Sequence, residues 1–418
     1  MASAPLPEPP SPLPRSTFAA LRVRNFRLYF LGQLVSVSGT WMQSVAQIWL
    51  VLELTHSATA LGVVIALQFA PMLVAGPWGG LVVDRSNKRR LLLATQSAGA
   101  GLALLLGCLT AFSTVTVPQI FGLALALGVV NVFDNPARQT FLQEMVGRDL
   151  LPNAVSLNSV LINLGRVVGP AIAGTVIAVF GVAECFFFNA CSFAALLMAL
   201  LLMDVGALTP LRSVAKAPGQ VRAGLRYALA TPEIRSVLIS VFLIGILAFN
   251  FTVTLPLLAE VTFAGGAQLY GLFAASMGAG AVVGGVLTAR RQQPTLRYLS
   301  VVAAAFGVLL IGVGLSPSPL VAALVLALMG AASISFLATA NGLVQLASRE
   351  EMRGRVMSLY ALGFLGTTPI GAPLVGMLCG WTSPRVGLLL GGLAAIAAAL
   401  PPLRAHARRA TPISGCWR

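Results

Sequence analysis

The stretch Leu91–Ala111, which reads LLLATQSAGAGLALLLGCLTA, decides the fold because it contains no charged residue. An α-helix of about 20 apolar residues crosses the hydrocarbon core of a bilayer. A strand of a transmembrane barrel would instead alternate apolar and polar residues. The run therefore predicts a membrane-spanning helix and excludes a transmembrane barrel.

The composition of the whole chain indicates the same class. Of the 418 residues, 57% are hydrophobic and only 9% are charged, against about 25% charged residues in soluble domains. So few charges cannot cover a water-exposed surface. The sequence thus predicts an all-α polytopic membrane protein, with the lipid bilayer as its main partner.

Hydropathy and turn signals on either side of this stretch predict twelve spans. They are residues 26–54, 58–83, 91–112, 117–135, 154–180, 184–203, 234–260, 267–289, 296–315, 319–345, 355–380 and 384–403. The longest polar interval divides them into two six-helix bundles, 26–203 and 234–403. We expect a disordered cytoplasmic tail over 1–25, a cytoplasmic linker over 204–233 and a cytoplasmic tail over 404–418.

Basic residues predict the orientation in the membrane. When the intervals between spans are taken alternately, 25 of the 27 Lys and Arg residues fall on one side. Because basic residues stay on the cytoplasmic side, both termini are expected there. The net charge of +15 then reflects membrane topology and does not indicate a nucleic-acid partner.

The two bundles are related in sequence. A shift of 202 positions aligns Gly169 with Gly371, Gly174 with Gly376 and Gln143 with Gln345. Weak internal repeats of this kind occur in transporters built from two six-helix halves. The repeat predicts two pseudo-symmetric bundles.

The first span carries a stripe of polar side chains. Its members share one helical face, within an arc of about 80°, and are Gln33, Ser36, Thr40, Gln43 and Gln47. A polar stripe cannot face lipid at low cost, so it either lines a water-filled cavity or hydrogen-bonds a neighbouring helix. We predict that it lines a cavity, as part of a substrate or proton pathway.

The fifth span combines a polar face with a packing face. Asn163 and Arg166 share one face, and Arg166 lies near the bilayer middle, where an unpaired arginine costs several kcal/mol. Arg166 is expected either to pair with an acid or to face a cavity or an anionic ligand. Gly165 and Gly169 allow close approach of another helix, and Pro170 predicts a bend.

Three more polar residues lie in spans. Asn131 and Asp134 are on the fourth span and Asn250 is on the seventh. Asp134 either forms an ion pair at the helix end or carries a proton. The two asparagines either line a transport pathway or hydrogen-bond between helices.

Motifs for other chemistry are absent from the sequence. It has no G-x-x-x-x-G-K-[ST] phosphate loop and no H-E-x-x-H zinc motif, and its five cysteines have no metal-ligand spacing. We therefore expect a protein that is not an enzyme, has no metal or cofactor, and is not driven directly by ATP.

The loop between the second and third spans carries a family signature. It reads GLVVDRSNKRR from Gly80 to Arg90 and resembles the gating loop G-x-x-x-D-R-x-G-R-R of the major facilitator superfamily. Gly80, Asp84, Arg85 and Arg89 match the motif, Lys88 keeps the positive charge of its first paired arginine, and Arg90 follows as a further basic residue of the loop. Asn87 replaces the second glycine, and asparagine tolerates the left-handed conformation that such a turn would need. The resemblance implies the major facilitator fold.

Two further segments resemble one branch of that superfamily. Residues 165–174, GRVVGPAIAG, are similar to its antiporter motif and include Gly174. Residues 135–154 resemble the branch that contains the bacterial enterobactin exporter and macrolide efflux pumps. This resemblance implies a monomeric protein of the bacterial inner membrane that exports a drug-like or siderophore molecule against entering protons.

The superfamily also implies a latch between the bundles. Its loop acid caps the eleventh helix, and its loop arginine pairs with an acid at the base of the fourth. The corresponding contacts here are Asp84 with residues 354–357, and Arg85 or Arg89 with Asp134. A carboxylate at a helix N-terminus is favoured by the helix dipole.

The sequence therefore predicts a proton-coupled secondary transporter that works by alternating access on a small-molecule substrate. An importer or uniporter on the same fold is one alternative, and topology does not distinguish it from an exporter. A non-transporting scaffold or receptor is the other, although it would not need polar stripes in two spans.

Overall fold

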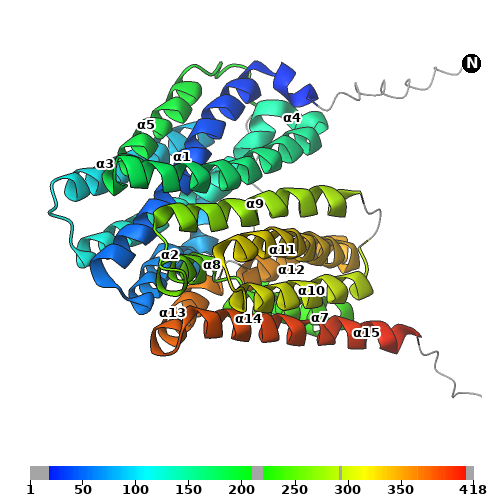
Figure 1. The fold of residues 1–418 in the computed structure, drawn as a ribbon. Helices are drawn as coiled ribbons and strands as arrows, with labels where there is room; N and C mark the ends of the chain where they lie inside the picture. Colours follow the sequence, from blue (N-terminus) through cyan, green and yellow to red (C-terminus); the bar gives the residue numbers. More distant parts are fainter. Residues whose placement is uncertain (1–17, 210–219, 291–293, 365, 411–418) are drawn as a thin grey trace, which may run out of the picture.

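The computed structural model describes residues 18–209, 220–290, 294–364 and 366–410, which are almost entirely helical and contain no strand. The N bundle consists of α1 (Arg24–Thr55), α2 (Ala58–Arg85), α3 (Lys88–Ala111), α4 (Val117–Val179) and α5 (Val182–Leu201). The C bundle consists of α7 (Pro232–Leu247), α8 (Phe251–Leu257), α9 (Ala267–Ala289), α10 (Leu296–Gly314), α11 (Pro319–Ala347), α12 (Glu350–Phe364), α13 (Thr368–Trp381), α14 (Pro384–Ala398) and α15 (Leu400–Ala410). Helix α6 (Gln220–Ala230) lies in the chain between the bundles. In Figure 1 the N bundle runs from blue to green, and the C bundle runs from the green of α7 to the red of α15.

Ten helical segments of the described chain are long and apolar enough to span a membrane. One of them, α4, has 63 residues and is broken at Gly147, so it supplies two crossings. Helix α1, with 32 residues, is long enough for a crossing although its polar stripe keeps it out of the ten. These segments are consistent with twelve crossings, and the predicted all-α polytopic class is confirmed.

Local sequence signals explain where many helices begin. The hydroxyls of Ser57, Thr295, Ser318 and Ser383 each accept a hydrogen bond from a backbone N–H in the first turn. Proline occupies the first turn of α4, α11 and α14, where its missing N–H costs nothing. Each span is therefore started by the residues that precede its apolar run.

The interval expected between the fourth and fifth spans, residues 136–153, is helical instead of a loop. Only Gly147 leaves the helical conformation, with φ 74° and ψ −177°. Apolarity marks the part of a helix that lies in lipid, whereas backbone hydrogen bonding continues into water. The prediction of a loop was wrong for that reason.

The expected tails are also partly structured. A 3₁₀ turn, Ala19–Arg22, packs onto the N bundle, and the Ala20 N–H donates to Asn153 Oδ1 at 2.9 Å. Asn25 is buried and hydrogen-bonds the backbone of Asp204. The C-terminal tail begins as helix α15, while residues 1–17 and 411–418 lie outside the described part.

The repeat in the sequence corresponds to equivalent packing in the two bundles. A Cβ added to Gly169 of α4 would lie 2.7 Å from the Ser38 oxygen of α1, and one added to Gly371 of α13 would lie 3.0 Å from the Ile246 carbonyl carbon of α7. Five residues further along, Gly174 abuts the start of α9, and Gly376 abuts the start of α2. The repeat-related helices thus each join their own bundle to the other one.

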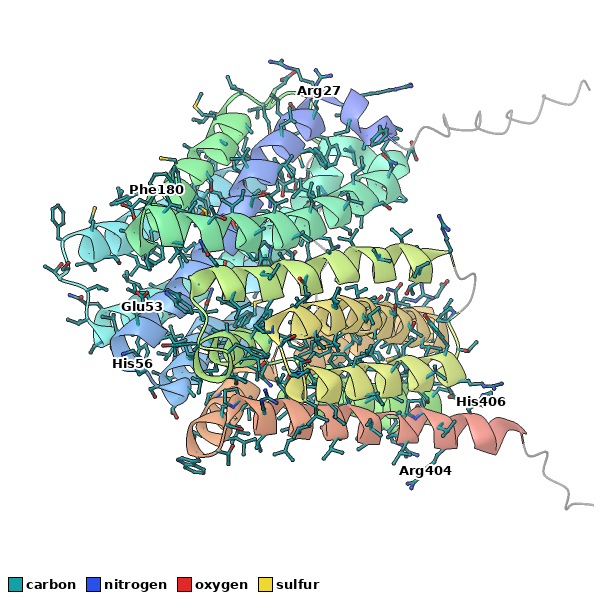
Figure 2. The ribbon with its side chains drawn as sticks, in the orientation of Figure 1. Arg27, Glu53, His56, Phe180, Arg404 and His406 are labelled. Carbon is teal, nitrogen blue, oxygen red and sulfur yellow. The ribbon has the colours of Figure 1, made fainter. Side chains whose placement is uncertain are left out.

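The two ends of the molecule differ in how closely the bundles meet. Figure 2 shows Glu53, His56 and Phe180 at one end, here the far end, and Arg404 and His406 at the other, here the basic end. The glycine contacts between bundles lie toward the far end, where His56 Nδ1 is also 3.6 Å from Glu260 Oε1 of the C bundle. Among the described residues, α12 packs on α6, α7 and α11 and does not pack along α2 or α4, so the bundles diverge toward the basic end (Figure 1).

Candidate functional site

A cavity of about 180 Å³ lies between the two bundles. One water needs roughly 10–15 Å³ of such space, so the cavity is far larger than a packing defect. Helices α1, α2 and α4 line it from one side, and α8, α9, α11, α12 and α13 from the other. Its wall is largely apolar, with six aromatic side chains: Trp41, Phe69, Phe249, Phe251, Tyr270 and Phe364.

Arg166 is the only charged residue among those that line the cavity. Its guanidinium carbon lies 5.0 Å from the centre of the Trp41 ring, a cation–π arrangement. Its Nε is buried without a hydrogen-bond partner, and no salt bridge within the described residues joins Arg166 to an acid. Of the two expectations for Arg166, pairing with an acid or facing a cavity, the structure shows the second.

The polar stripe of α1 points into the N bundle and not into the cavity, contrary to our prediction. Gln43 Oε1 accepts a hydrogen bond of 2.5 Å from Asn189 of α5, and Gln33 contacts Arg138 of α4. Gln47 is buried, while Thr40 is exposed and bonds its own helix. The cavity face of α1 is instead Trp41, Ser44, Val45 and Ile48, which is rotated by roughly 110° from the stripe.

Asp134 is held by neighbours within the N bundle. It accepts hydrogen bonds from Thr95 at 2.7 Å and Gln96 at 2.6 Å, both on α3, and pairs with Arg138 one turn along α4. The expected pairing with Arg85 or Arg89 is not present. Within the described residues, the Asp134 carboxylate is instead occupied by Thr95, Gln96 and Arg138.

The gating loop itself is anchored inside the N bundle. Lys88 forms a buried ion pair of 3.6 Å with Glu144 of α4, and Arg89 donates to the Leu200 carbonyl of α5 at 2.7 Å. Asn87 caps α3 by accepting from the Arg90 N–H, with φ −70°. The left-handed conformation expected for Asn87 was therefore wrong, because the position serves as a helix cap.

Asp84 is not placed at the start of the eleventh crossing in this structure. Helices α2 and α12 do not pack together in the described chain, and an added Cβ at Gly354 would meet no atom within 4 Å. Lys88 Nζ lies 3.4 Å from the Asp84 carbonyl, which keeps the loop compact. Gly80, Arg85 and Arg90 belong to the same segment, at the end of α2 and the start of α3, and the latch stays a prediction.

The remaining predicted pathway residues do not line the cavity. Asn163 is one turn from Arg166 toward the basic end and donates to the Ser159 carbonyl. Asn131 is half-buried on α4. Asn250 is buried at the break between α7 and α8, where its Oδ1 has no hydrogen-bond partner.

Helix packing accounts for the glycines of the antiporter-like motif. An added Cβ at Gly165 would lie 2.5 Å from Val37, and one at Gly169 would lie 2.5 Å from the Trp41 Cβ, both on α1. Pro170 lies in the cavity wall beside Arg166. This close approach of α1 positions the Trp41 ring against the Arg166 guanidinium.

Sequence reasoning missed the aromatic wall of the cavity. Phe249 stacks on Phe306 with ring centres 5.3 Å apart and meets Phe364 edge-on at 5.5 Å. Phe249 and Phe251 flank Asn250, where the seventh crossing is interrupted. A polar residue between two phenylalanines in an apolar run was the available signal.

Comparison with known proteins decides the family. Residues 15–411 match the transmembrane secretion effector family. The chain belongs to this family of major facilitator transporters. It is a multi-pass membrane transporter and not an enzyme, which confirms those predictions.

Curated relatives of the transporter include siderophore carriers. It is 27% identical to the staphyloferrin A transporter of Staphylococcus aureus over 84% of this chain and 88% of the relative. It is 28% identical to the enterobactin exporter EntS of Citrobacter koseri over 88% of each chain. The predicted resemblance to the enterobactin exporter branch is confirmed.

Solved structures similar to the transporter share its fold. One is a bacterial homologue of the human lysosomal transporter Spinster in an inward-facing, unoccupied conformation, with a TM-score of 0.68, 13% identity, and coverage of 93% of this chain and 96% of that one. Another is a peptide-bound transporter of the POT family, with a TM-score of 0.75, 12% identity, and coverage of 93% and 97%.

Proposed function

We propose that the protein is a proton-coupled secondary transporter that exports a small amphipathic molecule, of the siderophore or drug-like class, across the bacterial inner membrane. The observation that carries the proposal is a cavity walled by both bundles, with the bundles joined at the far end and apart at the basic end. Alternating access requires such a site at the interface of two rigid halves.

The basic end corresponds to the cytoplasm in this proposal. Arg404 and His406 lie at this end (Figure 2), and 25 of the 27 Lys and Arg residues fall in the intervals assigned to the cytoplasmic side by the positive-inside rule. The conformation is then inward-facing, the state in which an exporter takes up its substrate. The names of the staphyloferrin A and enterobactin relatives favour a siderophore among candidate substrates.

Transport in inside-out vesicles with an imposed pH gradient tests the proposal. Vesicles with an acidic lumen are expected to accumulate a labelled siderophore or drug from a panel, and a protonophore is expected to abolish accumulation. Vesicles from cells without the gene are the control. Uptake that runs the other way would support an importer, and gradient-independent equilibration would support a uniporter.

A non-transporting scaffold or receptor is disfavoured by the cavity wall. A scaffold has no use for a buried arginine in a cavity between bundles, because the desolvation of that charge is costly. If vesicles that contain folded protein transport no compound in the panel, that result would support the scaffold or receptor alternative.

A further inference from the structure

The guanidinium of Arg166 lies in the cavity wall without a carboxylate to balance its charge among the described residues. Arg138, whose side chain is 19% exposed, pairs with Asp134, whereas Arg166 has no acidic partner among the described residues. Its Nε is enclosed and makes no hydrogen bond. A buried cation in this condition is stabilised by any anion that enters the cavity.

Trp41 compensates the Arg166 charge only in part. The ring lies 5.0 Å from the guanidinium carbon and is fixed there by the packing of α1 on Gly169. A π face attracts the cation but accepts no N–H···O hydrogen bond in the guanidinium plane. The donor atoms of Arg166 therefore stay available to a ligand.

The rest of the wall suits the body of that ligand. Phe249, Phe251, Phe364 and Tyr270 line the same space as Arg166, and no second charged side chain is present among the lining residues. Aromatic faces bind flat or aliphatic parts of a ligand, and a single charged residue in such a wall can fix the orientation of that ligand.

We infer that the cavity selects organic anions, with a carboxylate or equivalent anionic group on Arg166 and an apolar body against the aromatic wall. This inference rests on the proposed function for its physiological meaning, but binding itself does not require transport. Charge-assisted bonds from a guanidinium to an oxyanion are strong and directional. Arg166 is thus a specificity-determining residue for the substrate class.

Equilibrium binding of two matched probes tests the inference. 8-Anilino-1-naphthalenesulfonate carries one negative charge, and N-phenyl-1-naphthylamine has the same rings without it. Both are titrated by fluorescence into the full chain in nanodiscs of phosphatidylcholine alone, so that no anionic lipid competes, with empty nanodiscs subtracted.

Arg166→Gln is expected to weaken binding of the sulfonate about tenfold or more and to change binding of the neutral probe less than twofold. Arg166→Lys should retain most of the preference. Arg226→Gln on α6 removes one exposed charge outside the cavity and should change neither affinity.

A second variant keeps the test decisive if Arg166→Gln does not fold. Ser44→Asp adds a carboxylate to the cavity wall and keeps Arg166, so it should also weaken sulfonate binding selectively. Unchanged sulfonate affinity in Arg166→Gln, or equal losses for both probes, would overturn the inference. Lost vesicle transport with intact anion preference would reject the proposed function alone.

Discussion

Lys88 and Glu144 form an ion pair that water hardly reaches. Both side chains are 7% exposed, and their charged atoms are 3.6 Å apart. The pair links the first turn of α3 to α4. Removing one partner leaves the other charge buried without this ion pair, which costs free energy.

We therefore expect Lys88→Met or Glu144→Met alone to lower the free energy of unfolding by about 3–5 kcal/mol. The double variant, which buries two apolar groups instead, should recover most of that loss. Unfolding in mixed micelles of sodium dodecyl sulfate and a mild detergent measures each term. Additive losses in the double variant would show that the two residues act independently.

At the residue scale, the sequence predicted that one face of the first helix is polar, but it did not predict which neighbouring helices that face would contact. Helical periodicity correctly places Gln33, Gln43 and Gln47 on one face. A helix in a two-bundle transporter, however, has two faces away from lipid, one toward its own bundle and one toward the cavity. Asn189, which donates a hydrogen bond to Gln43, is 146 positions away and gave no local signal.

Helix α1 and the second half of α4 approach closely along a glycine face. An added Cβ at Gly169 would lie 2.5 Å from the Trp41 Cβ and 2.7 Å from the Ser38 oxygen. Gly122, near the start of α4, has no atom within 4 Å of such a Cβ. The two positions allow one substitution to be compared in tight and open surroundings on the same helix.

Gly169→Ala is expected to destabilise the protein by about 1–3 kcal/mol, because α1 must shift to relieve the overlap. Gly122→Ala should be neutral or stabilising by up to about 1 kcal/mol, since alanine favours the helix. Thermal unfolding in detergent compares them. Equal stability of the two variants would contradict the packing role of Gly169.

At the element scale, spans were predictable and their interruptions were not. Apolar runs and capping residues placed the helices to within a few residues, as with Ser318 before α11. The break between α7 and α8 and the continuous helix through residues 136–146 depend on packing and on hydrogen bonding outside lipid. Hydropathy contains no information about helix packing or about backbone hydrogen bonding outside lipid.

At the scale of the whole molecule, the superfamily resemblance implies a contact between the bundles at the basic end. Asp84 lies at the end of α2, and α12, which begins at Glu350, is not among the helices that pack closely on α2 in the described chain. The superfamily resemblance implies that the Asp84 carboxylate reaches the start of that helix when the bundles close at the basic end. The helix dipole would then stabilise the closed state.

Asp84→Asn is accordingly expected to insert and fold normally but to lower vesicle transport several-fold, because a contact of about 0.3–2 kcal/mol is lost from one state only. Asp204→Asn, which removes an exposed acid at the same end, is the matched control. Transport by Asp84→Asn at the wild-type rate would exclude the latch.

The seam between α2 and α13 closes the far end, and Gly376 is part of it. An added Cβ there would lie 2.5 Å from the Ala58 oxygen, so Gly376→Leu forces the two helices apart. If the bundles move as rigid bodies, separation at the far end must bring them together at the basic end. Overpacking by about 1–3 kcal/mol corresponds to a population shift of roughly 5–150-fold.

Spin labels at Val160 of α4 and Val286 of α9, both exposed toward the basic end, report this movement by electron–electron distance measurement in a background without native cysteines. Gly376→Leu is expected to move the distance distribution to shorter values, while Gly101→Leu, whose added Cβ meets no atom within 4 Å, leaves it unchanged. An unchanged distribution in Gly376→Leu would mean that the two ends of the transporter open independently. Rocking of the bundles about the central cavity, and with it the alternating exposure of Arg166, would then be excluded.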